Sequence, residues 1–220
     1  MLGCTFGTLL ITTVGGGYLF PDRRPGDEVL SYLKKQIIHD NIKIQTGNSV
    51  GSFQIKGSDF ILNTSNGEVI KADAVLLTTG FDLFKSERKE EYGYGIYDNV
   101  ITSADLEMMF REKELKLKNG EKPEKIGFVH CVGSRDEKAG NLYCSKLCCV
   151  TAVKQAIELK ETISDCKVFC FYMDMRMGGA LYEELYRDAQ ENYGIGFIRG
   201  KVSEVGINIS NKLIAKVEDT

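Results

Sequence analysis

Residues 126–149 read IGFVHCVGSRDEKAGNLYCSKLCC. The opening run, Ile126–Cys131, is mostly apolar and predicts a buried strand, and four cysteines follow within the quoted residues. Helix-like and strand-like segments then alternate, in the order helix Val150–Leu159, strand Lys167–Tyr172, helix Tyr182–Tyr193 and strand Ile195–Ile198. This alternation predicts a βαβαβ unit with a parallel sheet and right-handed crossovers, and therefore an α/β fold class.

The chain before this unit has a different pattern. Asp27–Asp40 has apolar residues at helical spacing, and Ala74–Leu77 predicts a buried strand that enters a tight turn. A helix capped by Ser103 is expected over Ser103–Arg111, and Lys85–Glu91 is expected to be a solvated surface. Short strands are expected at Ile42–Gln45, Ser52–Ile55, Phe60–Asn63 and, after an Asn66-Gly67 turn, Glu68–Ile70.

Glu114–Lys125 is dense in charge and contains Gly120 and Pro123, which is typical of a linker. We therefore expect a first domain over residues 1–113, a linker over 114–125 and a second domain over 126–220. The end of the chain, Leu213–Thr220, is expected to be a strand. The strand, glycine-rich turn and helix that open a nucleotide-binding domain are missing, so we expect the sequence to be a piece of a longer protein.

The composition narrows the class of protein. The 220 residues are 43% hydrophobic and 27% charged with a net charge of −3, which gives no electrostatic basis for binding nucleic acid or an anionic membrane. Seven cysteines, an odd number that includes an adjacent pair, argue against a secreted disulfide framework and for a reducing, cytoplasmic location. Met1–Gly17 is uncharged but too short to span a bilayer, and predicts a buried strand that runs into glycines.

The clustered cysteines have the spacing C-x12-C-x3-C-C, formed by Cys131, Cys144, Cys148 and Cys149. Thiolates are soft ligands, and four of them suit zinc or an iron–sulfur cluster. Two alternatives are that some of them are buried apolar residues, or that Cys148 and Cys149 form a redox-active pair. Cys4, Cys166 and Cys170 are expected to be packing residues.

Several segments resemble one family, that of the heterodisulfide reductase A subunits, which includes quinone-interacting oxidoreductase flavoproteins. The most specific are Cys131–Asp136 and Tyr143–Cys149, and the resemblance extends to Tyr92–Thr102, Tyr172–Arg176 and Phe197–Gly200. It implies that Cys131, Cys144, Cys148 and Cys149 bind one [4Fe-4S] cluster. It also implies part of a thioredoxin-reductase-like flavoprotein with two dinucleotide-binding domains: a partial FAD-binding domain with a small inserted β-sheet, then a Rossmann-like domain that carries the cysteines.

The resemblance extends to the flavin. Ala74–Phe81 resembles the strand-to-turn segment that packs beside FAD in such flavoproteins, which implies FAD contacts at Thr79, Gly80 and Phe81, with Val50 near the adenine. The G-x-G-x-x-G fingerprint and the ferredoxin-type C-x2-C-x2-C-x3-C runs of the family are absent from the sequence. FAD binding is therefore expected to need the missing N-terminal segment. His130 is expected to be structural, with a role beside the cluster as the alternative.

The function implied is an electron-transfer iron–sulfur flavoprotein subunit of a heterodisulfide reductase-like complex, which moves electrons between FAD and a [4Fe-4S] cluster to partner subunits. A peripheral membrane complex and a homodimer are open alternatives, and nucleic acid and transmembrane segments are not expected. Two other functions remain. One is an NAD(P)H-dependent disulfide oxidoreductase that uses a Cys148–Cys149 dithiol, and the other is a zinc-stabilised interaction module.

Overall fold

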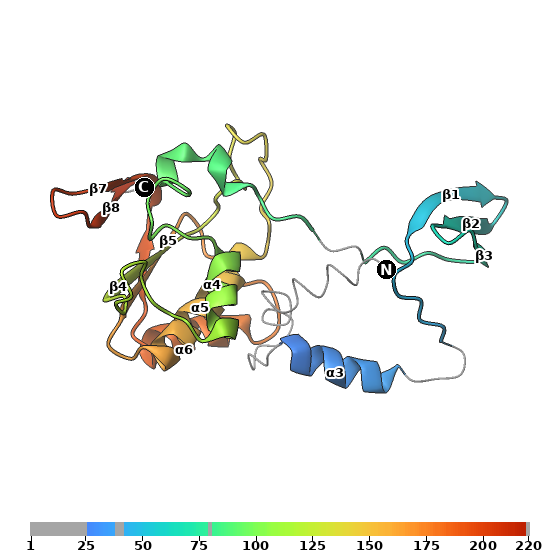
Figure 1. Cartoon of the computed structure of the whole chain (residues 1–220), viewed down its shortest axis with the longest axis horizontal. Helices are drawn as coiled ribbons and strands as arrows, with labels where there is room; N and C mark the ends of the chain where they lie inside the picture. Colours follow the sequence, from blue (N-terminus) through green and yellow to red (C-terminus); the bar gives the residue numbers. More distant parts are fainter. Residues whose placement is uncertain (1–25, 38–41, 79–80, 219–220) are drawn as a thin grey trace. The chain divides into compact units, whose positions relative to one another are not determined.

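The computed structural model describes residues 26–37, 42–78 and 81–218 (Figure 1). Contacts divide the described chain into two compact units with a boundary between Asp82 and Leu83, and each unit is described separately below. The strand predicted within Met1–Gly17, and Cys4, Thr79 and Gly80, lie outside the described residues.

The first unit is a small antiparallel sheet preceded by a helix. Its elements are α3 (Gly26–Gln36), β1 (Val50–Lys56), β2 (Asp59–Thr64) and β3 (Val69–Ala72), with the strands in the order β1-β2-β3. The predicted Asn66-Gly67 turn joins β2 to β3, where Gly67 has a φ of 85° and its N–H donates to the Thr64 carbonyl at 3.0 Å. The three predicted strands are confirmed to within two residues at each end. The helix predicted at Asp27–Asp40 is confirmed up to Gln36, and residues 38–40 lie outside the described residues.

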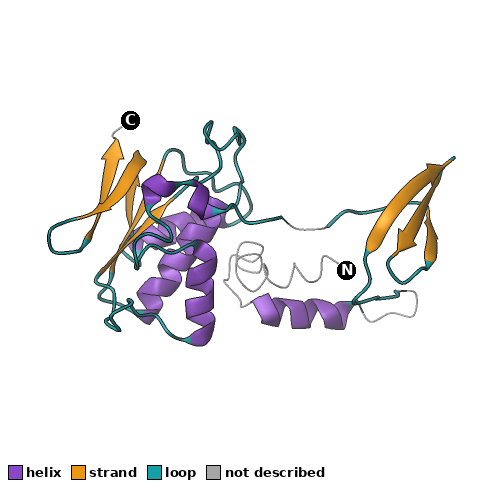
Figure 2. Ribbon diagram, turned by 45° about the horizontal axis from the view of Figure 1, so that its top comes forward, coloured by secondary structure: helices purple, strands orange, loops and turns teal. Residues whose placement is uncertain are grey.

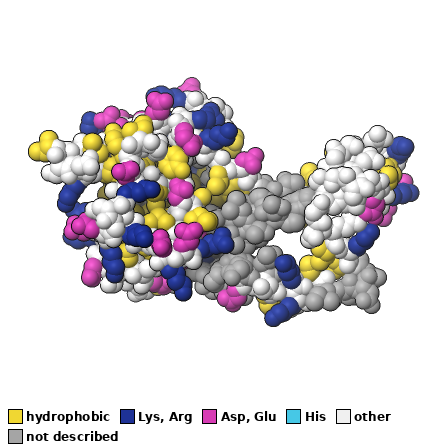
Figure 3. Space-filling model, in the orientation of Figure 1, with side chains coloured by type: hydrophobic (Ala, Val, Ile, Leu, Met, Phe, Trp, Pro, Cys, Tyr) yellow, Lys and Arg dark blue, Asp and Glu magenta, His cyan; other side chains and the backbone are white. Residues whose placement is uncertain are grey.

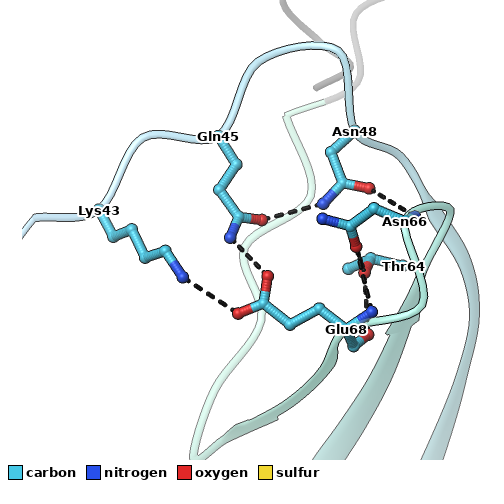
Figure 4. A network of polar contacts seen from close by, with 6 residues as sticks. All are labelled: Lys43, Gln45, Asn48, Thr64, Asn66 and Glu68. Atoms are coloured by element: carbon cyan, nitrogen blue, oxygen red, sulfur yellow. Dashed lines mark hydrogen bonds and ion pairs between the residues drawn. The ribbon is translucent and has the colours of Figure 1, made fainter.

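Residues 42–48 run beside the sheet as an irregular segment, so the strand predicted at Ile42–Gln45 is wrong. Side chains hold this segment in place (Figure 4). The Glu68 carboxylate accepts hydrogen bonds from Gln45 Nε2 at 2.6 Å and Lys43 Nζ at 3.0 Å, and these two contacts lower the pKa of Glu68. Asn48 Nδ2 donates to Gln45 Oε1 at 3.0 Å. Side-chain hydrogen bonds thus anchor a segment whose alternating pattern predicted a sheet ladder.

The buried strand predicted at Ala74–Leu77 is also wrong. The segment is irregular, and the side chains of Leu76 and Leu77 are 87% and 78% exposed. An apolar run becomes a buried strand only where other strands pair with it and other elements cover it. Among the described residues of this unit, no strand pairs with Ala74–Leu77.

The second unit contains the predicted βαβαβ arrangement. Its elements are the 3-10 helices η2 (Ser86–Arg88) and η3 (Glu90–Tyr92), then α4 (Ser103–Glu112), β4 (Lys125–Val129), α5 (Cys148–Thr162), β5 (Lys167–Tyr172), α6 (Tyr182–Glu191), β6 (Gly196–Arg199), β7 (Lys201–Ile207) and β8 (Leu213–Glu218). Strands β4, β5 and β6 pair in parallel in that order, which confirms the parallel sheet and the α/β class. β7, which was not predicted, forms an antiparallel hairpin with β8.

The core of this unit lies between the parallel sheet and its helices (Figure 2). Val168 and Cys170 lie two residues apart on one face of β5 and are almost completely buried. They form a hydrophobic cluster together with Val153, Ala156 and Ile157 of α5. Full burial of a valine or isoleucine side chain contributes about 1.5–3 kcal/mol relative to exposure. The core therefore fixes α5 against β5, and with it the first turn of α5.

Residues ahead of β4 also belong to this unit. α4 begins with a capping box, in which Thr102 Oγ1 accepts from the Asp105 N–H and Asp105 accepts from the Thr102 N–H. The cap is thus Thr102 rather than the predicted Ser103. Leu106 of α4 is buried in the core cluster beside α5, so the 114–125 segment joins two elements of one unit. On the face of this unit drawn in Figure 3, basic and acidic side chains are interspersed.

Candidate metal centre

The predicted cysteine site lies between the carboxyl end of β4 and the first turn of α5. Cys131 follows β4 by two residues and has a left-handed backbone with a φ of 60°, which turns the chain sharply away from the sheet. Cys148 and Cys149 are the first two residues of α5. The N-terminus of a helix has unpaired N–H groups and a partial positive charge, which favour thiolates there.

Of the four predicted ligands, Cys148 and Cys149 belong to a group of side chains whose ligand atoms lie within 4.8 Å of one another among the described residues, and Cys131 and Cys144 do not. The Cys148 thiol lies beside the thiols of both Cys131 and Cys149. These contacts lower the pKa of Cys148 and, together with burial, raise the pKa values of Cys131 and Cys149. Cys144 lies close enough to Cys149 for its charge to raise the pKa of that thiol, and its sulfur accepts from the Lys146 N–H at 3.3 Å. All four are free thiols.

His130 joins this group, although the sequence indicated a structural role for it. A ring nitrogen of His130 and the sulfur atoms of Cys148 and Cys149 lie within 4.8 Å of one another. The side chain is 8% exposed, and burial lowers its pKa, so the neutral imidazole is favoured. The only sequence signal was its position directly before Cys131 at the end of a strand.

The loop that connects Cys131 to Cys144 is closed on itself. Asp136 and Asn141 exchange backbone hydrogen bonds at 2.8 and 3.0 Å, and the Arg135 N–H donates to the Tyr143 carbonyl at 2.9 Å. Asn141 Nδ2 donates to the Gly133 carbonyl at 2.8 Å. These bonds hold residues 133–136 beside residues 141–143, so the chain doubles back on itself between Cys131 and Cys144.

Two ion pairs fix this loop to the rest of the unit. Lys89 Nζ lies 2.7 Å from both Asp136 Oδ2 and Glu91 Oε1, and Lys89 and Asp136 are both buried. Lys89 is therefore not part of the solvated surface that the charge run Lys85–Glu91 predicted. On the other side of the loop, Arg135 Nη1 lies 2.8 Å from Oδ2 of Asp174, a residue of the segment after β5. The backbone carbonyl of Asp174 also accepts a hydrogen bond from the Cys149 thiol at 3.8 Å.

The donor set fits a soft metal or an iron–sulfur cluster. Thiolate sulfurs and an imidazole nitrogen are the ligands that zinc, copper and iron–sulfur centres take. Cys131 lies beside Cys148 as a third thiol. A redox-active Cys148–Cys149 pair does not need a third thiol, whereas a metal site does. Cys166 and Cys170 lie in the hydrophobic core, and burial raises the pKa of Cys170 to about 12, as expected of packing residues.

Of the four residues predicted to contact FAD, the structure describes Val50 and Phe81. Val50 begins β1 with a side chain that is half exposed, and Phe81 is 38% exposed. Thr79 and Gly80 lie outside the described residues. Contact of these four residues with FAD stays a prediction.

The chain is similar to the A subunits of several curated heterodisulfide reductases. It is 43% identical over 157 residues to that of the H(2):CoB-CoM heterodisulfide,ferredoxin reductase of Methanothermobacter marburgensis, an alignment that covers 69% of this chain and 24% of the relative. It is 42% identical over 158 residues to the iron-sulfur A subunit of the CoB–CoM heterodisulfide reductase of Methanocaldococcus jannaschii, with the same shares. For the A subunit of the ferredoxin/F(420)H(2)-dependent CoB-CoM heterodisulfide reductase of Methanosarcina acetivorans, the identity is 41% over 156 residues, or 68% and 20% of the two chains.

The chain thus spans about a quarter of the length of the curated relatives it matches. No protein-family model matches it. Within the described residues, no helix is both long enough and apolar enough to cross a membrane.

Proposed function

The chain belongs to the family of heterodisulfide reductase A subunits, and from this we propose that it is an electron-transfer iron–sulfur flavoprotein subunit of a heterodisulfide reductase-like complex. The relatives are named as oxidoreductase subunits, and one is named as an iron–sulfur subunit. Because the match spans about a quarter of their length, the activity, the partner subunits and the cytoplasmic location are proposals for this chain. The described residues and the comparisons give no support to a homodimer.

One observation carries the proposal: the Cys148 thiol lies beside the thiols of Cys131 and Cys149, at the edge where β4 meets α5. With Cys144, they would hold one [4Fe-4S] cluster, which supplies reversible one-electron transfer when bound. The protein contributes the closed 132–143 loop, which orients Cys131 and Cys144, and the helix N-terminus, which favours their negative charge.

A flavin is the second part of the proposal. The small sheet β1-β2-β3 and the parallel sheet β4-β5-β6 have the character expected of an inserted sheet and a Rossmann-like domain in a flavoprotein with two dinucleotide-binding domains. FAD would contact Val50, Thr79, Gly80 and Phe81 when a segment with the glycine-rich dinucleotide-binding fingerprint is supplied together with this chain. Electrons would then pass between FAD and the cysteine site, and on to partner subunits.

The alternatives differ in what the chain binds. A disulfide oxidoreductase would use the Cys148–Cys149 dithiol without metal, and an interaction module would hold zinc. Anaerobic purification of the 220-residue chain, reconstitution with iron and sulfide, and metal analysis separate the three. We expect about four iron and four sulfide per chain. A metal-free chain that NAD(P)H reduces would support the first alternative, and one zinc without iron would support the second.

A matched pair of variants assigns the site. Cys131→Ala removes a thiol that contacts Cys148, whereas Cys170→Ala removes a thiol buried in the core of the same unit. We expect the first variant to lose most of its iron and the second to keep it. Equal iron content in the two variants would contradict the assignment.

A further inference from the structure

His130 is a buried side chain whose polar atoms find no partner among the described residues. Both ring nitrogens lack a hydrogen-bond partner there, although the side chain is only 8% exposed. Its backbone N–H donates to the Phe171 carbonyl at 3.1 Å, which fixes the residue at the end of β4. An imidazole carries at least one N–H in either tautomer, and an unpaired buried donor costs about 1–3 kcal/mol. The position therefore suits a partner that the described polypeptide does not supply.

The neighbours of the ring indicate the kind of partner. A ring nitrogen lies within 4.8 Å of the sulfurs of Cys148 and Cys149, two of the four proposed ligands. Four cysteines already provide the four ligands that one [4Fe-4S] cluster takes. The imidazole is then left beside the sulfur atoms of the site, at a position from which its N–H can donate to one of them.

We propose that the His130 N–H donates a hydrogen bond to a sulfur of the iron–sulfur group held by the four cysteines, and that it raises the reduction potential of that group without being a ligand. This inference rests on the proposed function. Reduction adds one electron and increases the negative charge on the sulfur atoms. A hydrogen bond to sulfur stabilises that charge, so the reduced state is favoured. No proton is transferred, and no bond of His130 forms or breaks.

The test compares variants of the full 220-residue chain after anaerobic reconstitution. His130→Leu removes the donor at similar volume, and His130→Gln keeps an N–H donor. The control is Phe128→Leu, a change on the same strand at a residue that packs against the hydrophobic core. Each protein is measured for iron content, for midpoint potential by a redox titration followed by EPR, and for nitrogen coupling by pulsed EPR.

We expect His130→Leu to keep its iron, to shift to a more negative midpoint potential and to lose a weak nitrogen coupling present in the wild type. His130→Gln is expected to lie closer to the wild type in potential, and Phe128→Leu to match it. If His130→Leu takes up no iron, the wild-type pulsed spectrum decides, because a weak coupling supports the hydrogen bond and its absence contradicts it.

Two results would overturn the inference alone: an unchanged potential in His130→Leu, or a strong coupling in the wild type that indicates a directly coordinated nitrogen. A wild-type chain that takes up no iron and sulfide would overturn both the proposed function and this inference. The iron content of the wild type therefore distinguishes the two failures.

Discussion

The Nζ atom of Lys89 lies 2.7 Å from Oδ2 of Asp136, and both side chains are more than nine-tenths buried. This ion pair joins the segment between η2 and η3 to the loop that carries Cys131 and Cys144. Asp136 also accepts from the Ala139 N–H at 3.2 Å, at the base of the turn that closes the loop. A charged residue in a hydrophilic run of sequence thus becomes part of the support of the cysteine site.

Replacing Lys89 tests that support. Lys89→Met leaves the buried Asp136 carboxylate without its cation, and we expect a loss of about 3–5 kcal/mol in the free energy of unfolding. The double variant Lys89→Met/Asp136→Leu removes both charges and should recover most of the loss. Denaturant unfolding measures both. Lys43→Met, which removes the exposed pair with Glu68, serves as the control and should have a much smaller effect on the free energy of unfolding, because water screens exposed ion pairs. A loss for Lys89→Met as small as that of the control would contradict the role of the pair.

The same pair predicts a response to acid. The Lys89 hydrogen bond lowers the pKa of Asp136 below its usual value of 3.8, so the folded state holds the carboxylate charged more strongly than the unfolded chain does. The resulting stability is present above the unfolded pKa and is lost as the pH falls through the lower folded value. Unfolding curves between about pH 6 and pH 2 should show this loss in the wild type and a weaker one in Lys89→Met/Asp136→Leu.

Glu107 of α4 predicts a pH dependence near neutrality. Burial beside Gln155 of α5 raises its pKa to about 8 from 4.5, although Gln155 Nε2 donates to it at 3.1 Å. The folded state then favours the protonated acid, so stability is full below about pH 4.5 and falls as the pH rises to about 8. Above about pH 8 the wild type should therefore have lost on the order of a few kcal/mol of its free energy of unfolding, and we expect Glu107→Gln to show no such loss.

Urea unfolding at about pH 6 and about pH 9 measures this difference. Glu112→Gln, at the exposed end of the same helix, is the matched control and should leave the pH dependence of the wild type unchanged. A wild type equally stable at both pH values, or a Glu107→Gln variant with the wild-type slope, would refute the prediction.

Two glycines in the loop between Cys131 and Cys144 differ in the space available for an added side chain. Gly133 and Gly140 have φ values of 72° and 76°, so an added Cβ costs about 1–2 kcal/mol of backbone strain at either position. At Gly133 the Cβ would also overlap with the ring of Phe84, whereas at Gly140 it meets open space. Gly133→Ala should therefore destabilise the unit and reduce iron uptake more than Gly140→Ala does. Equal effects in the two variants would contradict the close approach of Phe84 to the loop.

The sequence predicted best those elements that local pattern determines. β4, α5, β5, α6 and β6 were anticipated because their apolar periodicity directly reports burial in a layered sheet. Ala74–Leu77 has a comparable pattern but lies exposed, because burial depends on neighbouring strands rather than on the run itself. The strand β7, with mixed polar and apolar residues, gave no such signal.

The site was predictable in its cysteines but not in its surroundings. The spacing of Cys131, Cys144, Cys148 and Cys149 is visible in the sequence, whereas the burial of Lys89 and the approach of His130 to Cys148 follow from long-range folding. Lys89 looked solvated because charged neighbours surround it in the sequence. Its partner Asp136 lies more than forty residues away, and no local pattern connects the two.

EPR of the reduced chain shows directly whether the four cysteines hold an iron–sulfur cluster. After anaerobic reconstitution and reduction with dithionite, we expect a [4Fe-4S] signal that integrates to about one unpaired electron per chain in the wild type and in Cys170→Ala. The signal should be lost or strongly reduced in Cys148→Ala, because the Cys148 thiol contacts both Cys131 and Cys149. A full signal in Cys148→Ala, or a wild-type chain that holds zinc and no iron, would contradict the assignment of a [4Fe-4S] cluster to these cysteines.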